Sequence, residues 1–170
     1  MNPAPPQLVL VLAEEGHLQA WIAGVGFELL TGWRVAEGCC EFPGAMEYSL
    51  DALRRADAGV RRWWQPQLFV LPDLAEVAGL GGFKGPPRDG VVEIGYSVAP
   101  AWRGKGLATT AVRAMCANVF AEPGIVCVAA DTLPERNASV RVLEKAGFAH
   151  VGDGTDEDVG RTWRWERRRA

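Results

Sequence analysis

The sequence predicts a single α/β domain of the α+β kind, with a mixed, mostly antiparallel sheet that contains one parallel strand pair. Three observations lead to this fold class. The chain has 170 residues, 48% of them hydrophobic, which suits one domain built around one core. Several predicted strands follow one another through short turns, which makes them antiparallel neighbours. One long helix joins two strands between residues 91 and 130, and such a crossover makes those strands parallel.

The composition excludes several classes of partner. The formal net charge of −3 gives no broad basic surface, so we expect no nucleic acid as a partner. No apolar run reaches the length of a membrane span, and the start of the chain lacks the pattern of a signal peptide. We therefore expect one domain over residues 1–170, with residues 1–7 as a flexible, proline-rich start, and no membrane partner. The oligomeric state stays open, a homodimer included.

The cysteines point to the compartment. None of the four has the spacing of a metal site, and adjacent cysteines rarely bond to each other. Cys116 and Cys127 lie in apolar segments and are expected to be buried thiols. A reducing cytoplasm is the simplest location for such a chain. The four residues are Cys39, Cys40, Cys116 and Cys127.

The first half of the chain alternates short strands and helices. Apolar runs bounded by turn residues predict the strands. Acidic residues in a first turn predict the first helix, and Ser49 as a cap predicts the second. Residues 24–48 give no readable pattern. The predicted strands are residues 8–12, 68–71 and 75–83, and the predicted helices are residues 14–23 and 49–64.

The second half is easier to interpret. Residues 91–98 alternate, with valine, isoleucine and tyrosine on one face and Glu93, Gly95 and Ser97 on the other. A helix with an apolar stripe runs from the glycines that follow to Phe120. Residues 125–130 form a buried strand, parallel to residues 91–98. The remaining elements are a helix over residues 137–146 and a hairpin of residues 148–152 and 161–167 around an acidic turn.

A glycine-rich loop lies between the central strand and its helix. Its sequence is Arg103-Gly104-Lys105-Gly106-Leu107-Ala108. Glycines remove side chains that would keep a phosphate away, and a helix start offers unpaired N–H groups and a positive dipole end. The loop therefore suggests a diphosphate site. A turn without any ligand is the alternative. A dinucleotide site is another, although Thr109 stands at its third glycine position.

Three further residues carry candidate chemistry. Asn137 and Ser139 open the last helix, where they either cap it or lie over the carboxyl ends of the two parallel strands, the usual place for a ligand. Glu93 lies in mid-strand beside Gly95. Such a carboxylate is either held in a salt bridge to an arginine across the sheet, or faces a cleft as a base with a pKa raised by burial.

Taken together, these residues resemble the GNAT superfamily of acyl-CoA-dependent N-acetyltransferases. Arg103, Gly106 and Ala108 match its Arg/Gln-x-x-Gly-x-Gly/Ala motif. The similarity is greatest to the branch that includes the ribosomal-protein alanine N-acetyltransferases. Its pattern is visible as GLGGFKGPP, then VEIGYSVAPAWRGKGLAT, then NASVRVLEKAGF, over about residues 75–148.

The resemblance implies a GNAT-like domain with helices on both faces of the sheet and two parallel strands that splay apart. It implies acetyl-CoA as the cofactor, with its pantetheine on the backbone of the central strand and its diphosphate on the glycine loop. Asn137 would contact the cofactor arm, Glu93 would be the base, and Ser139 would bind or protonate near the leaving sulfur. Many relatives carry a tyrosine where this chain has Leu143. The implied cofactor-binding residues are Tyr96, Ser97, Val98, Arg103, Gly104, Lys105, Gly106, Leu107, Ala108, Asn137 and Ser139.

The implied activity is acetyl transfer to a primary amine, by direct attack on the thioester in a ternary complex. The acceptor is either a protein N-terminus or a small-molecule amine. A lysine amine with a pKa near ~10.4 is neutral about once in a thousand at pH 7.4, whereas an α-amine near ~8 is neutral roughly one time in five. Because a larger fraction of the α-amine is already neutral, its acetylation depends less on a general base, which mildly favours the α-amine as the acceptor. A non-catalytic acyl-CoA-binding or sensor module is the alternative, and a dinucleotide oxidoreductase is a third reading.

Overall fold

The structure, a computed structural model, describes residues 6–170, so most of the predicted flexible start lies outside the described residues. Its centre is an eight-stranded sheet in the order β1-β3-β4-β5-β6-β8-β7, with β2 beside β4. The strands are β1 (Val9–Leu12), β2 (Arg34–Val35), β3 (Gln67–Leu71), β4 (Glu76–Phe83), β5 (Val91–Val98), β6 (Cys127–Thr132), β7 (Ala149–Asp156) and β8 (Gly160–Arg168).

Every neighbouring pair in this order is antiparallel except β5 and β6. The helix α4 (Leu107–Phe120) joins these two strands as the predicted crossover. The predicted mixed sheet with its parallel pair is therefore confirmed. A second parallel contact, of two residues between β2 and β4, was not predicted because β2 lies in the unreadable residues 24–48.

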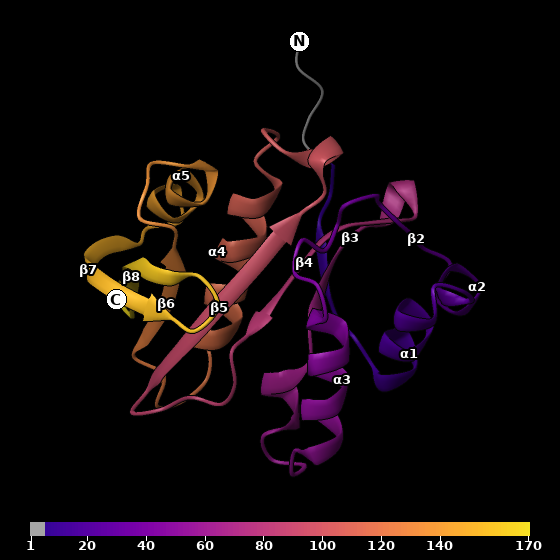
Figure 1. The fold of residues 1–170 in the computed structure, drawn as a ribbon, viewed down its shortest axis with the longest axis horizontal. Helices are drawn as coiled ribbons and strands as arrows, with labels where there is room; N and C mark the ends of the chain where they lie inside the picture. Colours follow the sequence, from indigo (N-terminus) through magenta and orange to yellow (C-terminus); the bar gives the residue numbers. More distant parts are fainter. Residues whose placement is uncertain (1–5) are drawn as a thin grey trace.

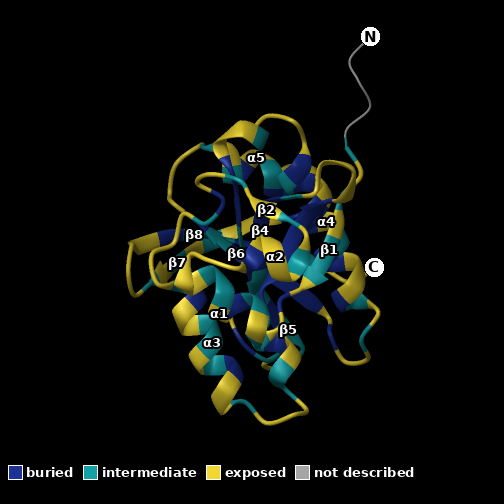
Figure 2. Ribbon diagram, turned by 90° about the vertical axis from the view of Figure 1, so that its right-hand side faces the viewer, coloured by how far each residue is buried: buried dark blue, intermediate teal, exposed yellow. Residues whose placement is uncertain are grey.

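Helices cover both faces of the sheet, as Figure 1 shows. On one side, which we call the α4 face, α4 and α5 (Ala138–Lys145) pack with Val92 and Ile94 of β5. On the other, the α1 face, three helices cover β3 and β4: α1 (Glu15–Ala23), α2 (Phe27–Thr31) and α3 (Ala45–Arg55). Figure 2 shows the buried residues gathered between the sheet and these helices. Three short 3-10 turns complete the fold: η1 (Arg61–Trp64), η2 (Pro72–Leu74) and η3 (Pro100–Trp102).

The central strand β5 alternates as predicted. Val92 and Ile94 are 1% and 2% exposed toward the α4 face, which leaves Glu93, Gly95 and Ser97 on the α1 face. β5 is also held closely by β4. A Cβ atom added at Gly79 of β4 would lie 2.6 Å from the carbonyl oxygen of Ser97, so the two backbones approach more closely there than a side chain allows.

The predicted helix over residues 49–64 is wrong at both ends. α3 begins at Ala45, after Gly44 in a left-handed conformation, so Ser49 lies inside the helix and does not cap it. The helix ends at Arg55, because Ala56 is extended (ψ 136°) and a turn over residues 57–60 precedes η1. The apolar residues Trp63 and Trp64, which lengthened the prediction, belong to that 3-10 turn.

The C-terminal hairpin is longer than predicted. β7 runs on to Asp156 and β8 starts at Gly160, so most of the predicted acidic turn is strand. Asp156 closes the short remaining turn by accepting the N–H groups of Asp158 and Val159 at 2.9 and 3.2 Å. Among residues 6–170, no helix combines the length and apolarity needed to cross a bilayer.

Candidate functional site

The parallel strands β5 and β6 separate part-way along their length. Their pairing runs from Val91 with Cys127 to Ile94 with Ala130, and no residue of β6 is paired with residues 95–98 within the described chain. These four residues stay paired with β4 on their other edge. β5 therefore presents an unpaired strand edge beyond Ile94, on the side where β6 would continue. This is the splay that the resemblance implies, and we call it the β5–β6 opening.

The backbone groups that face this opening can be identified from the ladder. Glu93 accepts the N–H of Lys84 at 2.9 Å, and Ala99 donates its N–H to Ala78 at 2.8 Å, so both turn their backbone toward β4. Alternate residues of a strand direct their backbone groups to opposite edges. Tyr96 and Val98 therefore direct theirs into the opening, where the resemblance expects the pantetheine.

Ser97 is placed differently. Its backbone faces β4 by the same alternation, and its buried hydroxyl donates to the carbonyl oxygen of Cys39 at 2.9 Å. The structure therefore does not bring Ser97 into the β5–β6 opening. Its hydroxyl instead ties β5 to the loop before α3.

The glycine loop has the backbone conformation that its sequence predicts. Gly104 and Gly106 have φ of 73° and 80°, in the left-handed region that other residues rarely adopt. α4 starts at Leu107 without any side-chain cap. In the part of the chain that the structure describes, the N–H groups of residues 104–108 have no hydrogen-bond acceptor. Five amides without an acceptor therefore lie together at the positive end of a 14-residue helix, and of their residues only Leu107 is buried.

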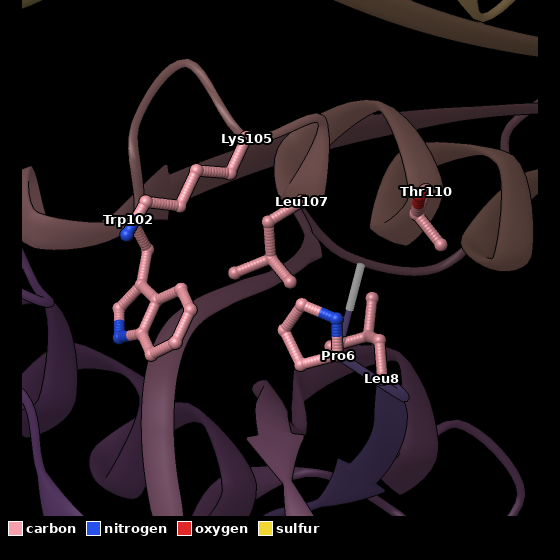
Figure 3. A pocket seen from close by; sticks show the side chains of 6 residues that line it. All are labelled: Pro6, Leu8, Trp102, Lys105, Leu107 and Thr110. Atoms are coloured by element: carbon pink, nitrogen blue, oxygen red, sulfur yellow. The ribbon is translucent and has the colours of Figure 1, made fainter. Parts of the chain in front are cut away.

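The two basic residues of the loop are engaged within the chain. Arg103 donates from Nε to the carbonyl oxygen of Val98 at 3.1 Å, and its Nη2 pairs with the carboxylate of Glu41. The ammonium of Lys105 lies 4.6 Å from the centre of the Trp102 ring, a cation–π contact. Both side chains line a small hollow of about 20 Å³. Figure 3 shows them with the other residues that line it, which are Pro6, Leu8, Leu107 and Thr110.

The start of α5 lies across the opening from β5. Asn137 caps this helix, since its Oδ1 accepts the N–H of Val140 at 3.1 Å, so the capping alternative is confirmed for Asn137 but not for Ser139. The half-exposed Ser139 has no partner for its hydroxyl among the hydrogen bonds of residues 6–170. Its carbonyl oxygen accepts the hydroxyl of Tyr96 at 3.4 Å. Leu143 is fully buried, so it offers no polar group to the site.

Glu93 lies in a network of ion pairs on the α1 face. Its two carboxylate oxygens are 2.7 Å from Lys84 Nζ and 2.6 Å from Arg164 Nη1, and Arg164 is also 3.1 Å from Asp131. Burial alone would raise the pKa of Glu93, but the hydrogen bonds from Lys84 and Arg164 outweigh it and hold the pKa below its usual value. The expected salt bridge to an arginine across the sheet is confirmed, and the expected rise in the pKa of Glu93 is wrong.

Three residues of the site were missed by sequence reasoning: Glu41, Lys84 and Arg164. A signal existed for Arg164, because Glu93, Asp131 and Arg164 lie on one face of three adjacent strands once the strand order is known. Lys84 directly follows β4, opposite Glu93, and was visible only as part of a turn. Glu41 lies in an irregular loop that carries no pattern.

Family comparison agrees with this geometry. Residues 22–149 match the family model described as the acetyltransferase (GNAT) domain. The chain belongs to the GNAT acetyltransferase family. The match spans most of the chain and includes the glycine loop, the β5–β6 opening and the start of α5.

Two relatives share part of this GNAT domain. The chain is 42% identical over 59 residues to a probable N-acetyltransferase, YjcK, of Bacillus subtilis (strain 168), a match over 35% of this chain and 33% of that protein. It is 39% identical over 70 residues to a kanamycin resistance protein of Rhizobium radiobacter, over 41% of this chain and 65% of that one. Each match thus spans less than two thirds of the relative's length.

Solved structures confirm the GNAT fold. The aminoglycoside acetyltransferase AAC(6')-Ib, in complex with coenzyme A, superposes with a TM-score of 0.67 at 23% identity, covering 96% of this chain and 95% of that one. A ribosomal-protein-S5-alanine acetyltransferase from Vibrio fischeri also gives 0.67, at 14% identity, covering 99% and 95%. The two agree equally well with this chain, so the comparison does not single out the ribosomal-protein branch.

Proposed function

We propose that this protein is an acetyl-CoA-dependent N-acetyltransferase that acetylates a primary amine. One observation carries the proposal: the unpaired edge of β5 leads directly to the unsatisfied amides of residues 104–108. An extended arm that carries amide groups can add to the strand edge. A diphosphate at the end of such an arm fits the start of α4. Coenzyme A combines both features in one molecule.

The residues present fit this cofactor. Five amides and the helix dipole suit the diphosphate, and Arg103 and Lys105 bring positive charge to the same loop. Tyr96 offers its backbone N–H and carbonyl oxygen to the pantetheine arm, and Val98 offers its N–H, because its carbonyl oxygen accepts Arg103 Nε. The side-chain amide of Asn137 keeps its NH₂ group for the arm while its oxygen caps α5. Bound acetyl-CoA supplies an acetyl thioester, whose carbonyl carbon is attacked by an amine with loss of the thiol.

The direction of attack follows from the packing. α4 and α5 close the α4 face around β5 and β6, so the acceptor amine reaches the opening from the α1 face. Glu93 lies on that face, one residue before the last paired residue of β5. The lowered pKa keeps Glu93 in its carboxylate form, which accepts a proton from the amine directly or through a water, but it also makes Glu93 a weaker base. The hydroxyl of Ser139 lies at the opening without a partner among residues 6–170, and it binds or protonates near the leaving sulfur.

The names of the relatives bear on the acceptor. A kanamycin resistance protein and an aminoglycoside acetyltransferase favour a small-molecule amine. The ribosomal-protein acetyltransferase favours a protein N-terminus, which has the lower amine pKa. We therefore place a small-molecule amine first and an N-terminal α-amine second.

The test is thiol release from acetyl-CoA with a panel of amines: kanamycin, spermidine and a peptide that begins with alanine. Acetylation of at least one amine, confirmed by the mass of the product, is the expected result. The alternative is a non-catalytic acyl-CoA-binding module, which the missing tyrosine at Leu143 and the paired state of Glu93 keep open. Such a module would bind CoA but release no thiol above background hydrolysis with any amine.

A further inference from the structure

Tyr96 reaches from β5 to α5 across the β5–β6 opening. It lies two residues beyond the last paired residue, Ile94, and its side chain packs against the α4-face cluster that also contains Val140 and Leu143. Its hydroxyl donates to the carbonyl oxygen of Ser139 in the first turn of α5. A phenol thus stands beside Ser139 at the inner end of the opening.

The hydrogen bond that Tyr96 makes there is a weak one. The two oxygens are 3.4 Å apart, whereas O–H···O bonds are shorter, at about 2.5–3.0 Å. A donor held at such a distance gains by turning to a closer and more negative acceptor. Burial also raises the pKa of Tyr96 above its usual value, so the phenol keeps its proton at every working pH. The hydroxyl of Tyr96 is therefore a protonated donor whose present acceptor, the carbonyl oxygen of Ser139, lies farther away than in an ordinary hydrogen bond.

Two other side-chain donors lie near Tyr96 at the opening, the hydroxyl of Ser139 and the NH₂ group of Asn137, and both are neutral. Leu143 is fully buried and offers no donor. From Val98, beside the loop that holds the diphosphate, β5 runs back to Ile94, about 13 Å at 3.3 Å per residue. An arm that follows this edge from the loop passes Val98 and then Tyr96 before it meets the paired part of the sheet.

We propose that the hydroxyl of Tyr96 donates a hydrogen bond to the sulfur of the thioester as it leaves, and so stabilises the thiolate. This inference rests on the proposed binding of acetyl-CoA. As the new C–N bond forms and the C–S bond breaks, the electron pair of the broken bond stays on sulfur. The amine gives its proton to Glu93 or to water, Tyr96 keeps its own proton, and the thiolate is protonated by solvent.

The test is a titration of the thiol of bound CoA, followed by the ultraviolet absorbance of the thiolate. A donor to the thiolate lowers the pKa of the thiol, so the pKa in the wild-type complex should lie below that of free CoA. In Tyr96→Phe it should rise by about one, a tenfold change in the ionisation constant. Tyr48→Phe is the matched control, because Tyr48 is the only other tyrosine and is exposed on α3.

Kinetics give a second readout. Tyr96→Phe should lower kcat for acetyl transfer about tenfold and leave the KM for acetyl-CoA within about twofold, since only the leaving group is affected. Equal thiol pKa values in wild type and Tyr96→Phe, or a wild-type value no lower than that of free CoA, would overturn the inference. If the thiol pKa depends on Tyr96 but no amine is acetylated, the proposed function fails and the role of Tyr96 stands.

Discussion

Arg164 on β8 joins two carboxylates of neighbouring strands, at 2.6 Å from Glu93 on β5 and 3.1 Å from Asp131 on β6. With Lys84 on the other oxygen of Glu93, the candidate base has a cation on each side. The two cations therefore hold the carboxylate of Glu93 in place and keep it ionised, but they also lower its pKa and make it a weaker base. In the proposed acetyl transfer, the contribution of Glu93 depends on its position more than on a pKa matched to that of the amine.

Removal of the Glu93 carboxylate tests this role. Glu93→Gln keeps the size of the side chain but cannot accept a proton, so kcat/KM for the amine should fall about a hundredfold, at the low end for a general base. The affinity for CoA, measured by calorimetry, should stay within about twofold. Glu166→Gln, on the same face of β8, is the matched control and should keep its activity. A hundredfold loss of CoA affinity in Glu93→Gln would instead show a structural role.

The pH dependence of stability follows from the lowered pKa of Glu93. Its ion pairs contribute stability that is present above the pKa of the unfolded chain, and that is lost as the pH falls through the lower folded pKa. Arg164→Met removes one cation and should raise the pKa of Glu93. The loss of stability below pH 5 should then be smaller than in wild type, as measured by urea unfolding between pH 3 and 7. Arg161→Met, which breaks only the exposed pair with Asp153, should follow the wild-type curve.

The pair of Glu41 with Arg103 predicts a competition with the cofactor. Arg103 cannot serve Glu41 and a phosphate equally, so Glu41→Gln should tighten CoA binding by about two- to fivefold, the range of an exposed ion pair. Arg103→Glu should weaken binding at least about tenfold. Glu37→Gln is the control, since Glu37 is exposed in the same loop. Unchanged CoA affinity in Arg103→Glu would contradict a diphosphate site at this loop.

Asn137 separates capping from cofactor contact. Asn137→Ala removes the cap and should lower stability by about 1 kcal/mol, whereas serine caps as well as asparagine, so Asn137→Ser should keep the wild-type melting temperature. Neither variant retains the side-chain NH₂ group. Both should therefore weaken CoA binding by a similar factor, about three- to tenfold for one hydrogen bond. If Asn137→Ala and Asn137→Ser differ in melting temperature but both bind CoA with wild-type affinity, Asn137 acts only as a helix cap and does not contact the cofactor.

Gly106, the residue just before α4, is a position where a side chain should disturb the loop. Its φ of 80° is left-handed, so Gly106→Ala should cost about 1–2 kcal/mol of stability and displace the amides that start α4. Thermal unfolding with and without CoA measures both effects. Gly59→Ala is the matched control, because Gly59 has an ordinary φ and open space around its Cβ position. Its melting temperature should change by less than about 2 °C.

The stretch from β5 to α4 could be predicted from the sequence because local signals agree there. The alternation of residues 91–98, the glycines and the apolar stripe to Phe120 all indicate the same strand, turn and helix. Residues 24–48 could not be predicted, because α2 has five residues and β2 two, too few for a period to show. The predicted cap at Ser49 is wrong because α3 begins after Gly44, whose backbone is left-handed and which makes no side-chain cap hydrogen bond. A helix start of this kind lacks the capping side chain that the prediction relied on.

The same contrast holds for the site. Backbone features were predictable: the glycine loop, the parallel pair and the cap at Asn137. The partners in long-range pairs were not: a salt bridge from Glu93 to an arginine was one of the alternatives, but Arg164 lies 71 residues away and meets Glu93 only through the order of strands β5, β6 and β8. The charge of Glu93 therefore follows from topology, and burial alone gave the wrong direction for its pKa.

The unpaired edge of β5 has a consequence for the freshly synthesised chain. Unpaired strand edges can pair with other chains, and residues 95–98 have such an edge on the side of β6, except at the carbonyl oxygen of Val98, which accepts Arg103. A cofactor that adds to this edge would supply the acetyl group and would also block the edge against pairing with another chain. Protein purified with CoA in excess should therefore resist self-association during heating, as light scattering would show, beyond the protection that ordinary ligand binding gives.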